Sequence, residues 1–520
     1  MGGTATILRP IVGGLFYFLL RIYYINLGGT AVFISSLLYY RGDFFIFKNQ
    51  EVVFMSIQLL IIAVYIAALF GISIWAKKRS SGSNENYALA GRKLNAPLIM
   101  VSIIGLAVGG ASTIGVSEHA FRVGLSAGWY TIAWGVGAIV MGLFMAKKYR
   151  EQNITTVSEL IEKHHDKKAV VLGVACQIVI QMVITSLQYV AGGSILHALL
   201  PDIFDVKTGI IVSAIVFIGI TFIGGMWSSS LANILNVILI YIGIAAATWA
   251  AITKVGGVAQ IVPSLPAGVP WMDMVAGVGL TGVISWVVVL VTVNLSLQSI
   301  VQISLSAQSA STARTGFVIG GLLMIPVGFM AALLGVLAKA LYPTLTPAAA
   351  LPQVIMGLEP VLAGITLAAL WAADVSTACN LLLSAATLFS KDIYSRFLNQ
   401  KADDNQVANM TRYAVLGIGL LTFYVAISVS GIIPTIMAGL SLTAAFSVVT
   451  MMALFAPNKT SVNAGFWTLL VGLIVLVAWQ TTPSVRILPN VIYAEWICCA
   501  ATYTIVAMLE PKKDTSSSPI

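Results

Sequence analysis

Apolar stretches of about 20 residues recur along most of the chain, and they constrain its fold more than any other feature. Each is long enough to cross the hydrocarbon core of a bilayer as a helix. Because lipid offers no hydrogen-bond partners to the backbone, such stretches must be helical. Charged residues make up only 9% of the chain, against about 25% in a typical soluble domain. The sequence therefore predicts an all-α polytopic membrane protein.

The apolar pattern divides the chain into an N-terminal extension at 1–52, a membrane domain at 53–508 and a polar tail at 509–520. It predicts about thirteen spans within the membrane domain. These are 53–76, 96–118, 124–146, 168–196, 208–226, 229–252, 274–297, 315–341, 361–388, 411–430, 432–455, 461–481 and 488–508.

The Lys and Arg residues beyond residue 53 collect in alternate loops. One side holds Arg122, Lys207, Lys254, Lys339 and Arg486, and the loops of the other side hold the rest. Because basic loops stay in the cytoplasm, the first span starts outside and the C-terminus lies inside. The same bias accounts for the net charge of +9, so we expect no nucleic-acid partner.

Residues 1–52 allow two interpretations. The apolar run from Ile22 to Tyr40 could form an extra N-terminal helix, although Arg21 and Arg41 flank it without a clear sidedness. Alternatively, the start codon is wrongly assigned and the native protein begins at Met55. Both interpretations stay open at this point.

The stretch 361–388 carries an unusual polar group within an apolar helix. Ser376 and Thr377 adjoin each other, and Asp374 lies two residues earlier. Such groups are costly in a membrane unless they have partners. The hydroxyls could bond back to carbonyls one turn earlier and allow close helix packing. They could instead bind an alkali cation, which prefers hard oxygen ligands.

Four segments, taken in order, resemble the sodium:solute symporter family, which includes proline, pantothenate, monocarboxylate and sodium-glucose symporters. They are Tyr87–Leu94, Thr156–Glu162, Phe222–Met226, and Ser376–Thr377 continued by Asp392–Tyr394. Each motif is weak alone, but the ordered set agrees with the topology.

This resemblance implies a LeuT-like fold of two inverted five-helix repeats, at 96–252 and 274–455, within a transporter domain at 53–508. Broken helices would surround a site near the middle of the membrane. Glycines in corresponding spans of the two repeats agree with this expectation, because glycine allows a helix to unwind. They are Gly105, Gly109 and Gly110 in the first, and Gly277, Gly279 and Gly282 in the second.

The resemblance also implies a sodium ion between the spans 96–118 and 361–388. Matched residue by residue, its ligands are the carbonyls of Gly105, Val108 and Ala373 and the hydroxyls of Ser376 and Thr377.

The chain departs from the family at other positions. Some members carry an acid or asparagine where this chain has Ala107, and many carry an aspartate where it has Asn233. Helix serines of a second sodium site in some members correspond to Cys379 and Asn380. We therefore expect one sodium ion per cycle. Asp374 is a candidate coupling residue that keeps proton coupling open.

Polar residues elsewhere in the spans are candidates for the solute path. They are Ser112, Gln181, Thr185, Gln188, Asn294 and Ser441. No cationic residue lies centrally to bind a carboxylate, although the N-terminus of a broken helix could do so. The region around Gly110 also lacks the acid–amide pair that some sugar-transporting members of the family carry nearby. The resemblance therefore favours an amino acid or an organic or vitamin-like acid over a sugar.

We therefore expect a secondary active transporter that couples sodium entry to uptake of a small organic solute by alternating access. A proton-coupled carrier using Asp374 and a sensor built on a transporter fold are the alternatives. No nucleophile–base pair or metal cluster indicates an enzyme, and no organic cofactor is expected. We expect a multi-pass protein of the cytoplasmic (inner) membrane, monomeric or weakly oligomeric.

Overall fold

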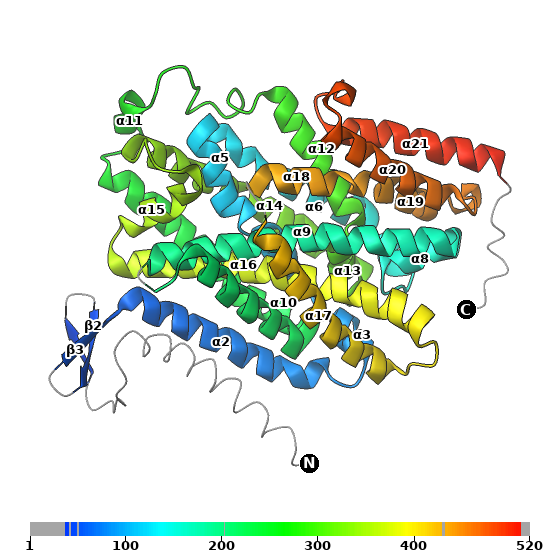
Figure 1. Ribbon diagram of the computed structural model, residues 1–520, viewed down its shortest axis with the longest axis horizontal. Coiled ribbons are helices and arrows are strands. Elements are labelled where there is room, and N and C mark those ends of the chain that lie inside the picture. The colour runs from blue at the N-terminus through cyan, green and yellow to red at the C-terminus, as the bar shows by residue number, and fades with distance from the viewer. Residues whose placement is uncertain (1–36, 41–42, 49–50, 202, 429–431, 511–520) are drawn as a thin grey trace, which may run out of the picture.

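The computed structural model describes residues 37–40, 43–48, 51–201, 203–428 and 432–510 (Figure 1). It begins with a small antiparallel sheet of β1 (Leu37–Tyr40), β2 (Asp43–Lys48) and β3 (Glu51–Ser56), in that order. Leu37 pairs with Ile46, and Asp43 pairs with Ser56. Most of the expected N-terminal helix falls outside the described residues. All later described elements are helical, which confirms the predicted fold class.

The helices follow the expected spans closely. Outside the two repeats lie α2 (Ile57–Ser80), α3 (Asn84–Leu89), α11 (Val258–Ile261), α20 (Ala464–Thr481) and α21 (Val491–Leu509). The segment 96–252 contains α4 (Ala96–Ala107), α5 (Val116–Val123), α6 (Trp129–Val140), α7 (Ala146–Glu151), α8 (Val157–His164), α9 (Lys167–Leu199) and α10 (Val206–Lys254). The segment 274–455 contains α12 (Leu280–Ser296), α13 (Gln298–Leu305), α14 (Ala310–Leu341), α15 (Ala350–Met356), α16 (Pro360–Leu388), α17 (Asp404–Ala426), α18 (Ile432–Ser441) and α19 (Thr443–Phe455).

Eight helical stretches of the described chain are long and apolar enough to cross a membrane, or up to ten if each of two bent pairs is one span. In Figure 1, α2, α9 and α21 run along the long axis of the molecule. The basic C-terminal end of α2 and the end of α21 lie on one side, whereas α11 and α15 lie on the other. The total of about thirteen spans remains a prediction.

The helix α10 contains two of the expected spans, because it reverses direction at Gly225. This residue has φ 52° and ψ −142°, far from helical values. On one side of it the Ser213 hydroxyl accepts a hydrogen bond from Trp371 of α16 at 3.2 Å. On the other side, the Gly243 carbonyl accepts one from Thr366, also of α16. Residues 30 positions apart thus reach the same part of one helix, so the halves of α10 run antiparallel.

Two helices are broken, one in each expected repeat. The pair α4 and α5, joined by a π-helical turn at Ala111–Gly115, is bent by 58°. The pair α12 and α13 is bent by 52°, with Leu297 in extended conformation between them.

The first break lies beside Gly109 and Gly110, where glycines were expected to allow unwinding. For the pair α12 and α13, the expectation that glycines mark the break was wrong. Gly279 precedes the first residue of α12, and Gly282 lies in its first turn. The break lies instead at Leu297, and α13 continues beyond the end predicted for this span.

Candidate functional site

The first half of the site is the C-terminal end of α4. This helix ends at Ala107, and the last carbonyls of any helix lack partners within it. The backbone N–H of Val108 still bonds to the Ile104 carbonyl at 2.7 Å. The carbonyls of Gly105 and Leu106 are instead directed to side chains of α16, so the break provides oxygen atoms at a buried position.

Two hydroxyl groups of α16 meet these carbonyls. The Ser376 Oγ lies 2.7 Å from the Gly105 carbonyl and 2.8 Å from the Ala373 carbonyl of its own helix. The Thr377 Oγ1 lies 3.0 Å from both the Gly105 and Leu106 carbonyls. Each hydroxyl has a single hydrogen for two carbonyls, so the cluster has more acceptor oxygens than donated protons. Such an oxygen-rich cluster suits a cation.

Glutamines of α9 contact both breaks. The Gly110 N–H donates to the Gln188 Oε1 at 2.8 Å. At the second break, the Gln177 side chain donates to the Ser296 carbonyl at 3.0 Å and accepts from the Gln298 N–H at 3.2 Å. One amide thus satisfies both ends of the gap around Leu297. The polar residues of α9 therefore stabilise the two breaks.

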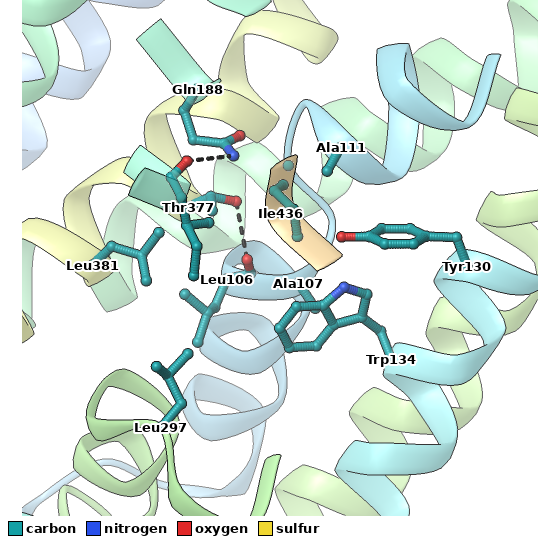
Figure 2. Close-up of a pocket in the computed structure, with 12 residues that line it drawn as sticks. Leu106, Ala107, Ala111, Tyr130, Trp134, Gln188, Leu297, Thr377, Leu381 and Ile436 are labelled. Carbon is teal, nitrogen blue, oxygen red and sulfur yellow. Dashed lines mark hydrogen bonds between the residues drawn. The ribbon is translucent and has the colours of Figure 1, made fainter. Parts of the chain in front are cut away.

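A small cavity lies between the two breaks (Figure 2). Its volume admits about one water molecule, so this conformation has no room for an organic solute. Tyr130 and Trp134 of α6 face Thr377 and Gln188 across the broken segment. The remaining lining residues are Leu106, Ala107, Gly109, Ala111, Ile184, Leu297, Leu381 and Ile436.

The structure brings four of the five expected sodium ligands together: Gly105, Ala373, Ser376 and Thr377. Among the described residues, the Leu106 carbonyl joins this cluster through Thr377. The fifth expected ligand, Val108, is the residue that ends α4. Its carbonyl takes no part in the hydrogen bonds of the cluster.

Of the six residues expected along the solute path, Gln188 lines the cavity. The other five lie buried nearby or farther away, each hydrogen-bonded within the protein. Their partners are the Ala107 carbonyl for Ser112, the Gln177 carbonyl and Ser384 for Gln181, the Gln181 carbonyl for Thr185, the Leu290 carbonyl for Asn294 and Glu495 for Ser441.

Asp374 is fully buried on α16, one turn before Thr377. Neither carboxylate oxygen makes a hydrogen bond of ordinary geometry with the described residues. A Cβ added to Gly110 would lie 2.5 Å from the Asp374 Oδ1, so the carboxylate is packed directly against the first break.

Two of the positions expected to depart from the family, Asn233 and Asn380, place neutral amides beside the cluster. Asn233 packs against Gly105, where an added Cβ would lie 2.8 Å from its side chain. Asn380 accepts from Ser229 at 2.9 Å and donates to the Ser376 carbonyl at 2.9 Å. The Asn233 Oδ1 accepts from Asn236 at 3.3 Å, so a neutral amide occupies the position where an aspartate would add a charge.

Sequence reasoning missed three features of the site. The Leu106 carbonyl carries no side-chain signal. The role of Gln177 depends on a gap that the apolar pattern did not reveal. Tyr130 and Trp134 resemble ordinary apolar residues of a span. Gln298 and Gln302 lie four positions apart in α13, a helical spacing of polar residues that is a sign of a helix after the break.

Two broken helices around a buried oxygen cluster define a transporter with the LeuT-like fold. The model of the sodium:solute symporter family matches residues 87–472, and the chain belongs to this family. It is therefore a membrane transporter that couples sodium to the movement of a small solute.

The chain is similar to characterised relatives throughout this region. It is 26% identical over 428 residues to a sodium/glucose cotransporter of Vibrio parahaemolyticus, covering 74% of this chain and 77% of the relative. It is 25% identical over 392 residues to the sodium/pantothenate symporter of Escherichia coli K12, covering 72% and 80%. A sodium-coupled sialic acid symporter, solved in a substrate-bound outward-open state, has the same fold at 17% identity. The TM-score is 0.72, with 88% of this chain and 99% of that chain covered.

Proposed function

We propose that the protein moves one sodium ion together with one small organic solute, an amino acid or an organic or vitamin-like acid, by alternating access. The observation that carries this proposal is the convergence of Ser376 and Thr377 on the Gly105 carbonyl at the first break. Unwound carbonyls and adjacent hydroxyls are the usual ligands of a coupling sodium ion.

The geometry supports a weak and reversible sodium site. Its oxygens come from two separate helices, α4 and α16, so relative movement of these helices changes the coordination. When sodium is bound, the hydroxyl hydrogens turn away and the oxygens of Ser376 and Thr377 become ligands. Sodium coordination would then replace the direct hydrogen bonds that join α4 to α16. Sodium occupancy would thereby control which conformation the solute site adopts.

One ion per cycle is proposed because the neighbouring polar network is neutral. Asn233 and Asn380 bond to other protein groups, and neither adds a charge that would favour a second cation. The solute would occupy an enlarged form of the cavity between the breaks. Gln188 is the polar residue of the expected path that already lines it.

A proton-coupled carrier is the second candidate, and the unpaired carboxylate of Asp374 favours it. A transporter-fold sensor is the third, although an intact sodium cluster supports transport. We also propose a cytoplasmic (inner) membrane location, and the distribution of basic loops supports an orientation with the start of α2 outside and the C-terminus inside. We propose a monomer or weak oligomer without an organic cofactor, and no enzymatic activity.

The test is equilibrium binding of radioactive sodium to the purified protein. Thr377→Ala removes a proposed ligand and should weaken sodium binding by about 10-fold or more. The matched control is Thr366→Ala on the same helix, whose hydroxyl bonds to the Leu362 carbonyl at 2.8 Å, away from the cluster. Unchanged sodium affinity in Thr377→Ala would refute the proposed site.

A further inference from the structure

Asp374 lies on the face of α16 that borders the cavity. Thr377 and Leu381 line the cavity, and Asp374 precedes them by three and seven positions, which places it on the same helical face. Its Oδ1 points at Gly110, next to the cavity-lining Gly109. The carboxylate therefore lies one turn beyond the cavity, beside the segment that links the halves of the first broken helix.

No group of the described protein balances the charge of this carboxylate. None of the ion pairs among the described residues includes Asp374. The Gly110 N–H faces the Asp374 carboxylate and also donates to the Gln188 Oε1 at 2.8 Å, so it supplies a dipole but no charge. By contrast, the buried Asp392 has Arg396 at 3.2 Å. Because an unpaired charge within a membrane is costly, such residues mark paths of ions and substrates. The charge is therefore neutralised from outside the described protein, by a proton or by a positive charge that the cargo carries.

The surroundings of Asp374 suit an ammonium group better than a second sodium ion. Besides the Asp374 Oδ1, an added Cβ at Gly110 would first meet the Ala191 methyl group and the Gln188 amide oxygen. A sodium site needs several more oxygens than these two. An ammonium group needs only a few acceptors, and it is also attracted to aromatic faces. Tyr130 and Trp134 supply such faces on the opposite wall of the cavity (Figure 2).

The cavity also holds a donor suited to the other end of such a molecule. The indole N–H of Trp134 is buried and makes no hydrogen bond of ordinary geometry, its polar neighbour being the Tyr130 hydroxyl. The Asp374 carboxylate thus lies one turn beyond the cavity, and the Trp134 indole N–H, beside the Tyr130 hydroxyl, lies in its wall. A bipolar molecule, positive at one end and accepting hydrogen bonds at the other, matches both.

We propose that the transported solute carries a protonated or quaternary amine, bound by the Asp374 carboxylate, and an acceptor group that faces Trp134. This inference rests on the proposed symport function and narrows its solute to amine-bearing compounds. It excludes organic acids that lack an amine, and it excludes neutral sugars.

The test measures thermal stabilisation of the purified full-length protein in sodium chloride by matched pairs of compounds. The panel holds the twenty common amino acids, betaine and choline, and each is compared with an amine-free analogue of similar size. Alanine is paired with lactate, proline with cyclopentanecarboxylate, and choline with 3,3-dimethylbutan-1-ol. At least one amine should raise the melting temperature while its amine-free partner does not, because a ligand that binds only the folded state stabilises it.

Variants then test whether the Asp374 carboxylate is responsible for the stabilisation by the amine. Asp374→Asn should weaken binding of the stabilising amine by about 10- to 100-fold. The matched control is Glu495→Gln, which alters another buried carboxyl, far along the chain on α21 and bonded to Ser441. This control should retain the amine effect.

Several results would overturn the inference. One is that an amine-free compound raises the melting temperature as much as its amine-bearing partner. Another is that no amine raises the melting temperature. The third is that the amine stabilises Asp374→Asn as much as the unmodified protein. If Asp374→Asn fails to fold, the comparison of paired compounds on the unmodified protein still decides the solute class. Sodium binding measured without solute tests the proposed function separately. The proposed function and the inference about the amine can therefore fail independently.

Discussion

At the scale of single residues, Thr377 occupies the central position of the site. Its hydroxyl reaches two carbonyls of α4, and its side chain also lines the cavity. Gly109 makes this arrangement possible, because an added Cβ there would lie 2.3 Å from the Thr377 Oγ1 and 2.7 Å from the Gln188 Oε1. The proposed sodium ligand Thr377 and the cavity wall therefore meet at Gly109, where there is no room for a side chain.

We predict that Gly109→Ala weakens sodium binding by about 10-fold or more, because the methyl group must displace the Thr377 hydroxyl. The folded state should lose about 1–3 kcal/mol through overpacking. Radioactive sodium binding and thermal unfolding would measure these effects. The control is Gly417→Ala in α17, where an added Cβ meets no atom within 4 Å. Wild-type sodium affinity in Gly109→Ala would contradict the proposed geometry.

At the scale of elements, the sequence predicted the helices well and the helix breaks only in part. Apolar length located α9, α14 and α16 within a few residues, because a bilayer imposes that length. Glycines correctly indicated the break between α4 and α5. They misled for the second pair, because the extended Leu297 is held by the Gln177 side chain from another helix. Because this side chain comes from another helix, the sequence around Leu297 carries no signal of it.

The reversal of α10 provides a test at this scale. Gly225 has φ 52°, and an added Cβ would lie 2.4 Å from the Tyr87 carbonyl oxygen. Gly225→Ala should therefore destabilise the protein by about 1–3 kcal/mol, seen as a lower melting temperature. Gly219→Ala in the same helix is the control, because its added Cβ would meet Phe70 no closer than 3.3 Å. Equal melting temperatures of the two variants would contradict the reversal.

At the scale of the whole molecule, the ordered motifs predicted the family, and the family match over residues 87–472 confirms it. The candidate site could be predicted in outline, because Ser376 and Thr377 lie in a motif with a known partner helix. The cavity could not be predicted, since its walls combine residues of α4, α6, α9, α16 and α18 with residues of both helix breaks, such as Leu297. Ordinary apolar residues acquire a role there only through the packing of distant spans.

The central claim is that sodium and solute binding are coupled, and reciprocal affinities test it most directly. A solute is first identified by thermal stabilisation. One ratio compares the affinity for this solute in sodium chloride with that in potassium chloride. The other ratio compares the affinity for sodium with and without this solute. Linkage requires both ratios to be equal, and the account predicts an increase of about 5-fold or more. A solute affinity that is the same in sodium and in potassium would contradict sodium coupling.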